Sequence, residues 1–508
     1  MTTIIDIILP IFTLIVAALL TIPVFKLIRK SANKTALSLA WIIAIFIIAG
    51  LTVANLALTY YSVANPVATT ITLDAAADPA IATSFYIDAI SIYMAIIIVA
   101  IAAVIMIYTV LFVNSADRPS DRYIATMLLL TSALIGAVLA GDLLTFFIFW
   151  EAATAAAAFL MLYRKTAFSL NATLKYLIMV IIASAFVLLG LSIVYGITGS
   201  LNYVTIREVI SGTLVGSDIN LLIIAFVFIA AGYAIEAAIV PFHFWLPDAY
   251  TAAPAPSSAF LSALVDQGSY YILIRILLFI ILPPSVGGIT IFDWTLMLAV
   301  MAALSMIVGN LFALIQNNIK RLVAYICVAD VGYNLVAITS ATELGLAGNL
   351  YFLLIGGLTT AVAFMAVGII NSKGFHTLED FAGVGKKMPL SSLALVLAGL
   401  SFAGVPPLGG FIAKYMVFTA AISVDLTWLA IIGVITSVVQ TAYIFRLINI
   451  MYGKAPKDGV TTRIKENKYL LIPVFMLVAA IFILGLFPDI VLQLIQPIMG
   501  QLPWALPA

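Results

Sequence analysis

The sequence contains few charged residues, only two histidines and a single cysteine, and each shortage excludes a class of function. Only 9% of the 508 residues are charged, whereas a soluble domain carries about 25%. The net charge of +1 leaves no basic field for nucleic acid. Cys327 alone cannot form an internal disulfide or an all-cysteine iron–sulfur or zinc site. His243 and His376 both fall in predicted loops, so paired histidine ligation of a haem in the membrane is not expected. We therefore expect no metal, no cofactor and no redox centre in this chain.

Long apolar runs occur along the whole sequence. Hydrophobic residues make up 64% of the chain, and a membrane span needs roughly 20 apolar residues in a row. The first run, Ile4 to Ile28, is too long for the core of a signal peptide and reads as a spanning helix. The sequence predicts an all-α polytopic membrane protein with about fourteen helices: 4–28, 36–61, 87–114, 123–140, 142–163, 172–198, 219–241, 256–281, 292–315, 319–340, 346–372, 390–420, 424–450 and 469–495.

The basic residues alternate between the loops in a way that predicts the orientation of these helices. Twenty of the 23 Lys and Arg residues lie beside one set of alternating loops. On the opposite side we find only Arg207 in a loop and Arg275 near a helix end, and Lys414 lies inside a span. Because basic loops stay in the cytoplasm, we expect a multi-pass protein of the plasma membrane with both termini on the non-cytoplasmic side.

Two of the predicted spans are interrupted by proline. Pro241 precedes the segment HFWLPDAY at 243–250, and the second interruption contains Pro406, Pro407, Gly409 and Gly410. At membrane depth such breaks persist only inside protein or beside a water-filled cavity. Each break lies in the fourth helix of a five-helix block, and an odd number of helices inverts the second block. The pattern is typical of an inverted-repeat transporter.

The repeat divides the chain into four parts. We expect helices 1–3 at 1–122, the first five-helix repeat at 123–281, the second repeat at 292–452, and a cytoplasmic loop with the last helix at 453–508. No part has the composition of a soluble domain.

Five ionisable residues fall within the spans, where charged groups are costly and usually mark ion paths. Glu151 lies nine residues past Asp142, which places it about 13 Å into the membrane at about 1.5 Å per residue. Glu236 precedes the first break, and Lys414 follows the second. Asp266 and Asp330 lie near the middle of their helices. A packing role is as good an explanation for one such residue, but five beside two broken helices favour ion transport.

Several motifs resemble one known family, the antiporter-like, proton-conducting subunits of complex I, Mrp antiporters and membrane-bound hydrogenases or sulfane reductases. The likeness covers about residues 85–450. The most specific match is His243-Phe244-Trp245-Leu246-Pro247-Asp248-Ala249 followed by Ala253-Pro254-Ala255-Pro256-Ser257-Ser258-Ala259. The other matching segments are Phe85–Ser91, Phe149-Trp150-Glu151, Leu174-Lys175-Tyr176, Lys320-Arg321-Leu322, Gly332-Tyr333 and Gly404–Lys414.

The resemblance implies roles for individual residues and also shows departures from the family pattern. It implies that Glu151 is the essential acid of helix 5 and Lys414 the lysine of helix 12. The expected ion pathway comprises Glu151, Glu236, Asp266, Asp330, Lys414, Lys175, Lys320 and His243. At three positions where the family carries a basic residue, this chain has Glu236, Gln267 and Thr360. With Glu236 opposite Glu151, two acids would share one site and hold at least one proton.

These observations leave three functions open. In the first, the chain moves protons or sodium ions as a subunit of a multi-subunit respiratory complex, next to further antiporter-like subunits, while redox chemistry occurs elsewhere. In the second, the pathway is degenerate and the chain is a non-conducting scaffold of such a complex. In the third and weakest, it is a free-standing transporter. The retained Glu151, Lys414 and helix breaks favour the first. A haem enzyme is excluded by the lack of ligands, and nothing indicates a quinone groove.

Overall fold

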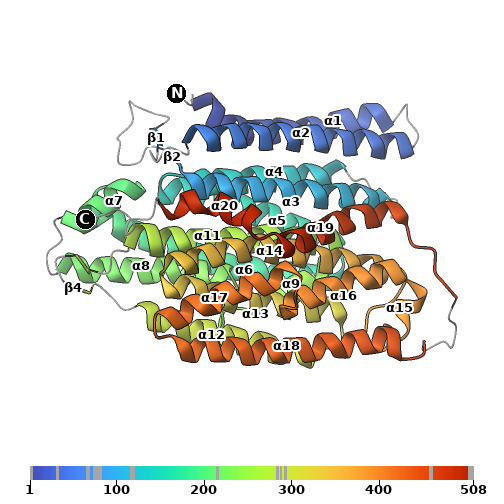
Figure 1. Ribbon diagram of the computed structural model, residues 1–508. Coiled ribbons are helices and arrows are strands. Elements are labelled where there is room, and N and C mark those ends of the chain that lie inside the picture. Colours follow the sequence, from blue (N-terminus) through green and yellow to red (C-terminus); the bar gives the residue numbers. More distant parts are fainter. Residues whose placement is uncertain are drawn as a thin grey trace.

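In the computed structural model, long helices lie nearly parallel and form one bundle (Figure 1). The structure describes residues 4–29, 34–63, 69–72, 83–114, 121–212, 217–281, 285–286, 289–290, 294–456 and 462–500. The N-terminal part contains α1 (Ile4–Arg29), α2 (Lys34–Val63), β1 (Thr69–Thr72), β2 (Ser84–Ile87) and α3 (Ala89–Asn114). The two strands pair antiparallel as a short hairpin. Helices α1 and α2 lie side by side along one edge of the bundle (Figure 1).

The middle of the chain forms the first group of helices. Its elements are α4 (Asp121–Leu139), α5 (Leu143–Leu162), α6 (Ala167–Thr198), α7 (Tyr203–Gly212), α8 (Ser217–Glu236), α9 (Trp245–Ala252), α10 (Ala255–Phe260), η1 (Leu261–Val265), α11 (Asp266–Ile274) and η2 (Arg275–Ile281). Here η1 and η2 are π-helical turns, so the run from α10 to η2 is one long span with two local distortions.

The remainder of the chain forms the second group. It contains β3 (Ser285–Val286), β4 (Ile289–Thr290), α12 (Trp294–Leu314), α13 (Ile319–Ser340), α14 (Glu343–Asn371), α15 (Val384–Lys387), α16 (Pro389–Ala403), α17 (Gly409–Ser423), α18 (Thr427–Gly453), α19 (Lys468–Leu486) and α20 (Asp489–Met499). Helices α13 and α14 are almost wholly buried and occupy the centre of the bundle.

The fold class is confirmed: the chain is an all-α polytopic membrane protein. Among the described residues, twelve helices are long and apolar enough to cross a membrane. The two other predicted spans fall on α1 and on the interrupted pair α16 and α17. The count of fourteen crossings and the inverted repeat stay predictions. The predicted helix 469–495 was wrong in extent, because α19 ends at Leu486 and Pro488 precedes the separate helix α20.

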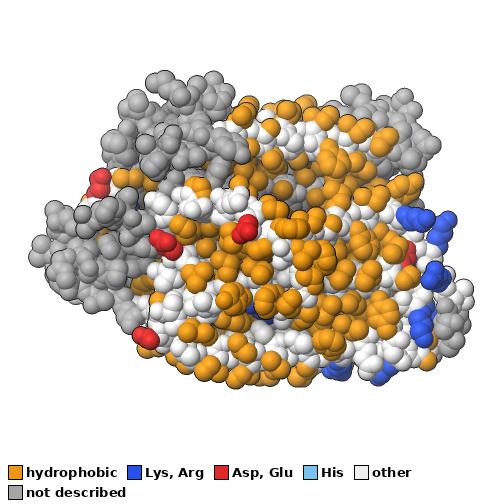
Figure 2. All heavy atoms as spheres, in the orientation of Figure 1, with side chains coloured by type: hydrophobic (Ala, Val, Ile, Leu, Met, Phe, Trp, Pro, Cys, Tyr) orange, Lys and Arg blue, Asp and Glu red, His pale blue; other side chains and the backbone are white. Residues whose placement is uncertain are grey.

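The outer surface has the composition of a lipid-facing one. Large apolar side chains are exposed along the outer helices, for example Leu51 at 66%, Ile181 at 66% and Val438 at 64%, and apolar atoms cover the middle of the face in Figure 2. The visible Lys and Arg side chains gather at the end of the bundle where α15 lies, and most visible Asp and Glu lie toward the other end (Figure 2). The side chains of several basic residues used for the orientation lie outside the described residues: Lys26, Arg29, Lys30, Lys34, Arg118 and Lys457.

The first helix break begins earlier than predicted. The sequence pattern extends this helix to 241, but α8 ends at Glu236 and Ala238 has a positive φ of 51°. One backbone donor of the break is paired with the second group of helices: the Val240 N–H donates to Ser305 Oγ of α12 at 3.1 Å. This bond satisfies a buried donor that the broken helix no longer pairs.

The second break separates α16 from α17. Gly404 ends α16 in the left-handed conformation, at φ 75°, where glycine carries no steric penalty. Gly410 lies directly against the Ser401 carbonyl of α16, and Gly485 of α19 lies against the Pro407 carbonyl. The two half-helices therefore meet at bare, buried backbone at Ser401 and Gly410, while Pro406 and Pro407 of the segment that links them are exposed.

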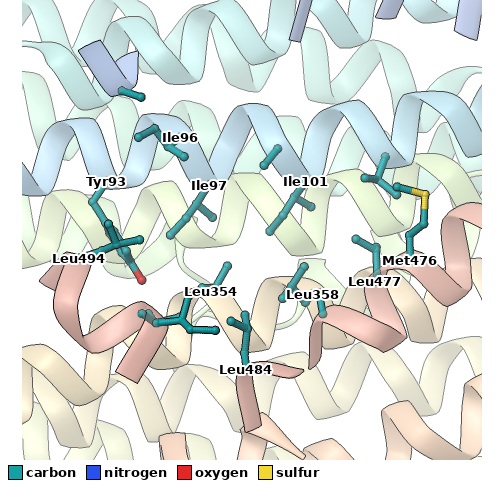
Figure 3. A pocket seen from close by; sticks show the side chains of 16 residues that line it. Tyr93, Ile96, Ile97, Ile101, Leu354, Leu358, Met476, Leu477, Leu484 and Leu494 are labelled. Atoms are coloured by element: carbon teal, nitrogen blue, oxygen red, sulfur yellow. The ribbon is translucent and has the colours of Figure 1, made fainter. Parts of the chain in front are cut away.

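An apolar pocket of about 480 Å³ lies between α3, α14, α19 and α20 (Figure 3). The side chains of Ile97, Ile101, Leu354, Leu358 and Leu484 face it. The pocket contains none of the ionisable residues predicted to carry ions.

Candidate functional site

Glu151 and Glu236 lie near the first helix break, as the sequence predicts. Glu151 is half-buried on α5 and accepts a hydrogen bond from Ser184 Oγ of α6 at 2.6 Å. Glu236 is the last residue of α8 and is 7% exposed, and its Oε2 atom has no hydrogen-bond partner. The two carboxyl groups are close enough to interact electrostatically. Two like acids in one buried site cannot both ionise without a large cost.

Asp266 is bound by a residue from the segment that follows the break. It is 5% exposed, and Tyr250 Oη of α9 donates to its Oδ1 atom at 2.5 Å. The π-helical turn η1 ends immediately before Asp266, and such turns occur frequently at functional sites. The neighbouring Gln267 donates to the Ser262 carbonyl at 3.4 Å, while its own side-chain oxygen has no partner.

Asp330 of α13 and Lys414 of α17 line the same small cavity near the second break. Both are buried, at 7% and 5% exposure, and both line a cavity of about 10 Å³. Lys414 Nζ donates to Gln440 Oε1 at 2.6 Å and to Ser437 Oγ at 3.1 Å, both on α18. It also lies 4.1 Å from the ring centroid of Tyr333, a favourable cation–π distance.

The three other predicted pathway residues lie around the broken segment α9. Lys175 binds Asp248 at 2.6 Å, and Arg321 contacts the same carboxylate at 3.1 Å. His243 is 4% exposed in the turn before α9. Lys320 is the second residue of α13, which has the bounds predicted for this helix, and is 5% exposed. Its ammonium donates to the carbonyls of Thr251 and Ala253 at the end of α9, where the helix dipole favours a cation.

The replaced family position Thr360 faces its own helix, not the ionisable residues. Its hydroxyl donates to the Gly357 carbonyl at 3.2 Å. The preceding residue, Thr359, lines the cavity between Asp330 and Lys414 and lies 3.0 Å from Ser401 Oγ. The Thr359 hydroxyl also donates to a carbonyl of its own helix, that of Ile355 at 2.7 Å. Because one residue along a helix rotates a side chain by about 100°, Thr359 lines the cavity of Asp330 and Lys414 and Thr360 does not.

A buried ion pair that the sequence reasoning did not assign to the site joins Asp88 and Arg275. The guanidinium contacts both carboxylate oxygens at 2.5 Å, and the two side chains are 2% and 1% exposed. Arg275 Nε also donates to Tyr271 Oη at 2.8 Å. Burial and the Asp88 carboxylate raise the pKa of Tyr86 on β2. The available signals were an arginine inside an apolar run and Asp88 within a family motif.

The described residues contain no group of three or more His, Cys, Asp or Glu side chains placed to hold a metal ion. The polar groups of the predicted pathway are carboxylates, hydroxyls, amides, the His243 imidazole and the ammonium groups of Lys175, Lys320 and Lys414. Such groups suit proton transfer and the binding of hard monovalent cations.

Comparison with known proteins places this arrangement in a family. Residues 140–440 match the family described as NADH:quinone oxidoreductase/Mrp antiporter, transmembrane. The chain belongs to this family. It is 32% identical over 406 residues to NADH-quinone oxidoreductase subunit N of Desulforamulus reducens, with 80% of this chain and 83% of the relative covered. It is 31% identical to F(420)H(2) dehydrogenase subunit N of Methanosarcina mazei, with 79% and 82% covered.

Solved structures of the NADH:quinone oxidoreductase/Mrp antiporter family extend the match to nearly the whole chain. A subunit of an archaeal membrane-bound sulfane sulfur reductase has a TM-score of 0.83 at 29% identity, with 97% of both chains covered. A chain of respiratory complex I from Thermus thermophilus has a TM-score of 0.73 at 26% identity, with 95% and 98% covered. A chain of the Mrp complex from Dietzia shares the fold, with a TM-score of 0.81 at 22% identity and 98% coverage of both chains.

Membership of the NADH:quinone oxidoreductase/Mrp antiporter family confirms the resemblance deduced from the motifs. The chain is an antiporter-like membrane subunit of the kind found in complex I and Mrp complexes. The match from 140 to 440 spans Glu151, both helix breaks and Lys414.

Proposed function

We propose that this chain translocates protons or sodium ions as one subunit of a multi-subunit, respiratory-type membrane complex whose redox reaction takes place in other subunits. The ions pass along Glu151, Glu236, Asp266, Asp330 and Lys414. The helix after the first break, α9, lies near Lys175, Lys320 and His243. These three residues form the side of the path nearest the basic end of the bundle.

The observation that carries the proposal is the placement of five buried or half-buried ionisable residues at two broken helices. Glu236 ends α8 at the first break, and Lys414 lies in the half-helix after the second. Asp266 is bonded to α9, which follows the first break. Buried ionisable groups at the interrupted helices of a membrane protein are costly and are typical of ion sites.

A second function is favoured by the groups that replace the family's basic residues. Gln267 and Thr360 cannot change charge, and Thr360 bonds only to its own helix among the contacts described. A chain with these replacements would serve as a non-conducting scaffold between neighbouring subunits. We favour ion translocation because titratable groups lie close to these positions. Asp266 precedes Gln267 on α11, and Asp330 lines the same cavity as Lys414.

The remaining features of the proposal follow from the sequence and the family. Relatives are named as subunits of complex I and of the F(420)H(2) dehydrogenase, so the partners proposed here are other membrane subunits, including antiporter-like ones, and the lipid bilayer. The location is the plasma membrane with both termini outside the cytoplasm. The two repeats, 123–281 and 292–452, form the two halves of the path. In the sequence they are preceded by the helices of 1–122 and followed by the loop and last helix of 453–508.

The test is ion flux through the native complex, reconstituted into liposomes under a potassium diffusion potential. Proton uptake is followed with a pH-sensitive dye and sodium uptake with a radioactive tracer. We expect Glu151→Gln to reduce the flux by about tenfold or more, because carboxyl groups that transfer protons contribute factors of about 10² or more. Equal flux through the wild type and Glu151→Gln, at the level of protein-free liposomes, would establish the scaffold function instead.

A further inference from the structure

The ammonium group of Lys414 is turned toward α18 although Asp330 lines the same cavity. Gln440 is fully buried, and its side-chain oxygen accepts from Lys414 Nζ at 2.6 Å. Ser437 accepts a second bond from this group. Asp330 Oδ1, by contrast, is buried without a hydrogen-bond partner. An unpartnered buried carboxylate oxygen is costly, so a further polar group is expected at Asp330.

The cavity between the two charged residues has the size and lining for one water molecule. Its volume is about 10 Å³, and a site that holds one water needs about 10–15 Å³ and two to four polar partners. Asp330, Lys414, Thr359 and Ser401 all line it. The two hydroxyls lie 3.0 Å apart and come from different helices, α14 and α16. The Thr359 hydroxyl donates to the Ile355 carbonyl of its own helix at 2.7 Å, so it accepts a hydrogen bond from a water in the cavity, and the Ser401 hydroxyl can donate one.

The backbone around the cavity favours a positive charge there. Helix α16 ends at Ala403, next to Lys414, and the C-terminal end of a helix carries a partial negative charge. A Cβ at Gly404 would lie 3.3 Å from Lys414 Cδ, so the glycine leaves room for the lysine stem. The lysine stem therefore lies against the C-terminal end of α16.

We propose that one water molecule, held by Thr359 and Ser401 in this cavity, carries a proton between Lys414 and Asp330. An N–H bond of the ammonium breaks as the water accepts that proton, and the water gives one of its own protons to the carboxylate. The charged pair becomes a neutral amine and a carboxylic acid, and the reverse transfer restores it. Thr359 and Ser401 are positioning residues, and Gln440 with Ser437 is the resting partner of the lysine.

This inference rests on the proposed function and assigns the proton step of its second half. The other titratable groups that interact with Asp330 come from three helices: Cys327 and Tyr333 on α13, Asp266 and Tyr270 on α11, and Tyr443 on α18. Asp266 is the only other carboxylic acid in this set, and it does not line the cavity.

The test measures potential-driven proton uptake by liposomes containing the native complex, in H₂O and in D₂O. We expect the double variant Thr359→Val and Ser401→Ala to lower the rate by about tenfold and to increase the solvent isotope effect, because the proton then crosses without its anchored water. The single variant Thr359→Ser keeps the hydroxyl and conducts at the wild-type rate. The matched control is Thr339→Val on α13, a buried threonine whose hydroxyl bonds to its own helix at Leu335, and it leaves the rate unchanged.

Three outcomes distinguish this inference from the proposed function. A double variant that conducts at the wild-type rate with an unchanged isotope effect overturns the water-mediated step, while the function stands if Glu151→Gln still abolishes conduction. An equal loss in Thr339→Val shows that the effect is one of packing and also overturns the inference. A wild-type complex that conducts no better than protein-free liposomes overturns both.

Discussion

Tyr250 and Asp266 are joined by a hydrogen bond of 2.5 Å between the hydroxyl and the carboxylate. Tyr250 belongs to α9, the short helix after the first break, while Asp266 begins α11 behind a π-helical turn. The ring of Tyr250 also packs edge-on against Phe364 of α14. One contact therefore links the position of α9 to the charge of the buried Asp266.

Removing that hydroxyl tests whether the contact matters for transport. We expect Tyr250→Phe to slow ion flux by about tenfold, because a hydrogen bond to a charged group is worth about 1.5–3 kcal/mol and tenfold corresponds to about 1.4 kcal/mol. The measurement is potential-driven flux in liposomes. Tyr108→Phe is the control, since Tyr108 is equally buried and its hydroxyl bonds to the Met365 carbonyl away from the acids. Equal losses in the two variants would refute a specific role for Tyr250.

Ser184 provides the only hydrogen bond described for the Glu151 carboxylate, at 2.6 Å. Ser184→Ala removes a donor that favours the ionised carboxylate, so we expect Glu151 to bind its proton more tightly and flux to fall several-fold. Ser184→Thr keeps the hydroxyl and should retain most of the flux. Ser192→Ala, on the same helix, removes a hydroxyl that bonds only to its own helix at Leu189. If Ser192→Ala slows flux as much, the effect belongs to α6 as a whole.

Much of this arrangement was predictable from the sequence because charge and proline are expensive in a membrane. Apolar length placed the spans, and the prolines placed both breaks to within a few residues. The positions of Glu236 and Lys414 at those breaks followed directly. What pattern alone could not give was side-chain direction. The pairing of Asp266 with Tyr250, and the choice of Thr359 over Thr360 as the cavity residue, depend on π-helical turns and helix rotation that leave no signal in apolar periodicity.

The buried pair of Asp88 and Arg275 should stabilise the protein rather than conduct. Removing one partner leaves an unpaired buried charge, which costs about 3–5 kcal/mol, so Arg275→Met should lower the unfolding temperature of the detergent-solubilised complex markedly. The double variant Asp88→Leu and Arg275→Met removes both charges and should recover most of the loss. A double variant as unstable as the single one would show that packing against Tyr86 and Tyr271, and not the charges, provides the stability.

Close backbone contact at the second break predicts a strict requirement for glycine. A Cβ at Gly410 would overlap the Ser401 carbonyl, which is backbone and cannot rotate away. We expect Gly410→Ala to prevent stable assembly, seen as loss of the subunit from the purified complex. Gly196→Ala is the control, because nothing lies within 4 Å of a Cβ at that helical position. Normal assembly of Gly410→Ala would mean that the two half-helices can separate without cost.

The substitution Glu236→Gln tests whether the ion path conducts or is degenerate, without disturbing the fold. The Oε2 atom of Glu236 is buried and unpartnered. Because the two acids share one site and hold at least one proton, a neutral amide of the same shape in Glu236→Gln should change stability by less than about 1 kcal/mol. Because an amide cannot release a proton, flux should nevertheless fall to the level of Glu151→Gln. The measurements are the unfolding temperature and ion flux of the same preparation. Unchanged flux would mean that ions bypass Glu236, and that the acid at this position does not replace the family's lysine in the path.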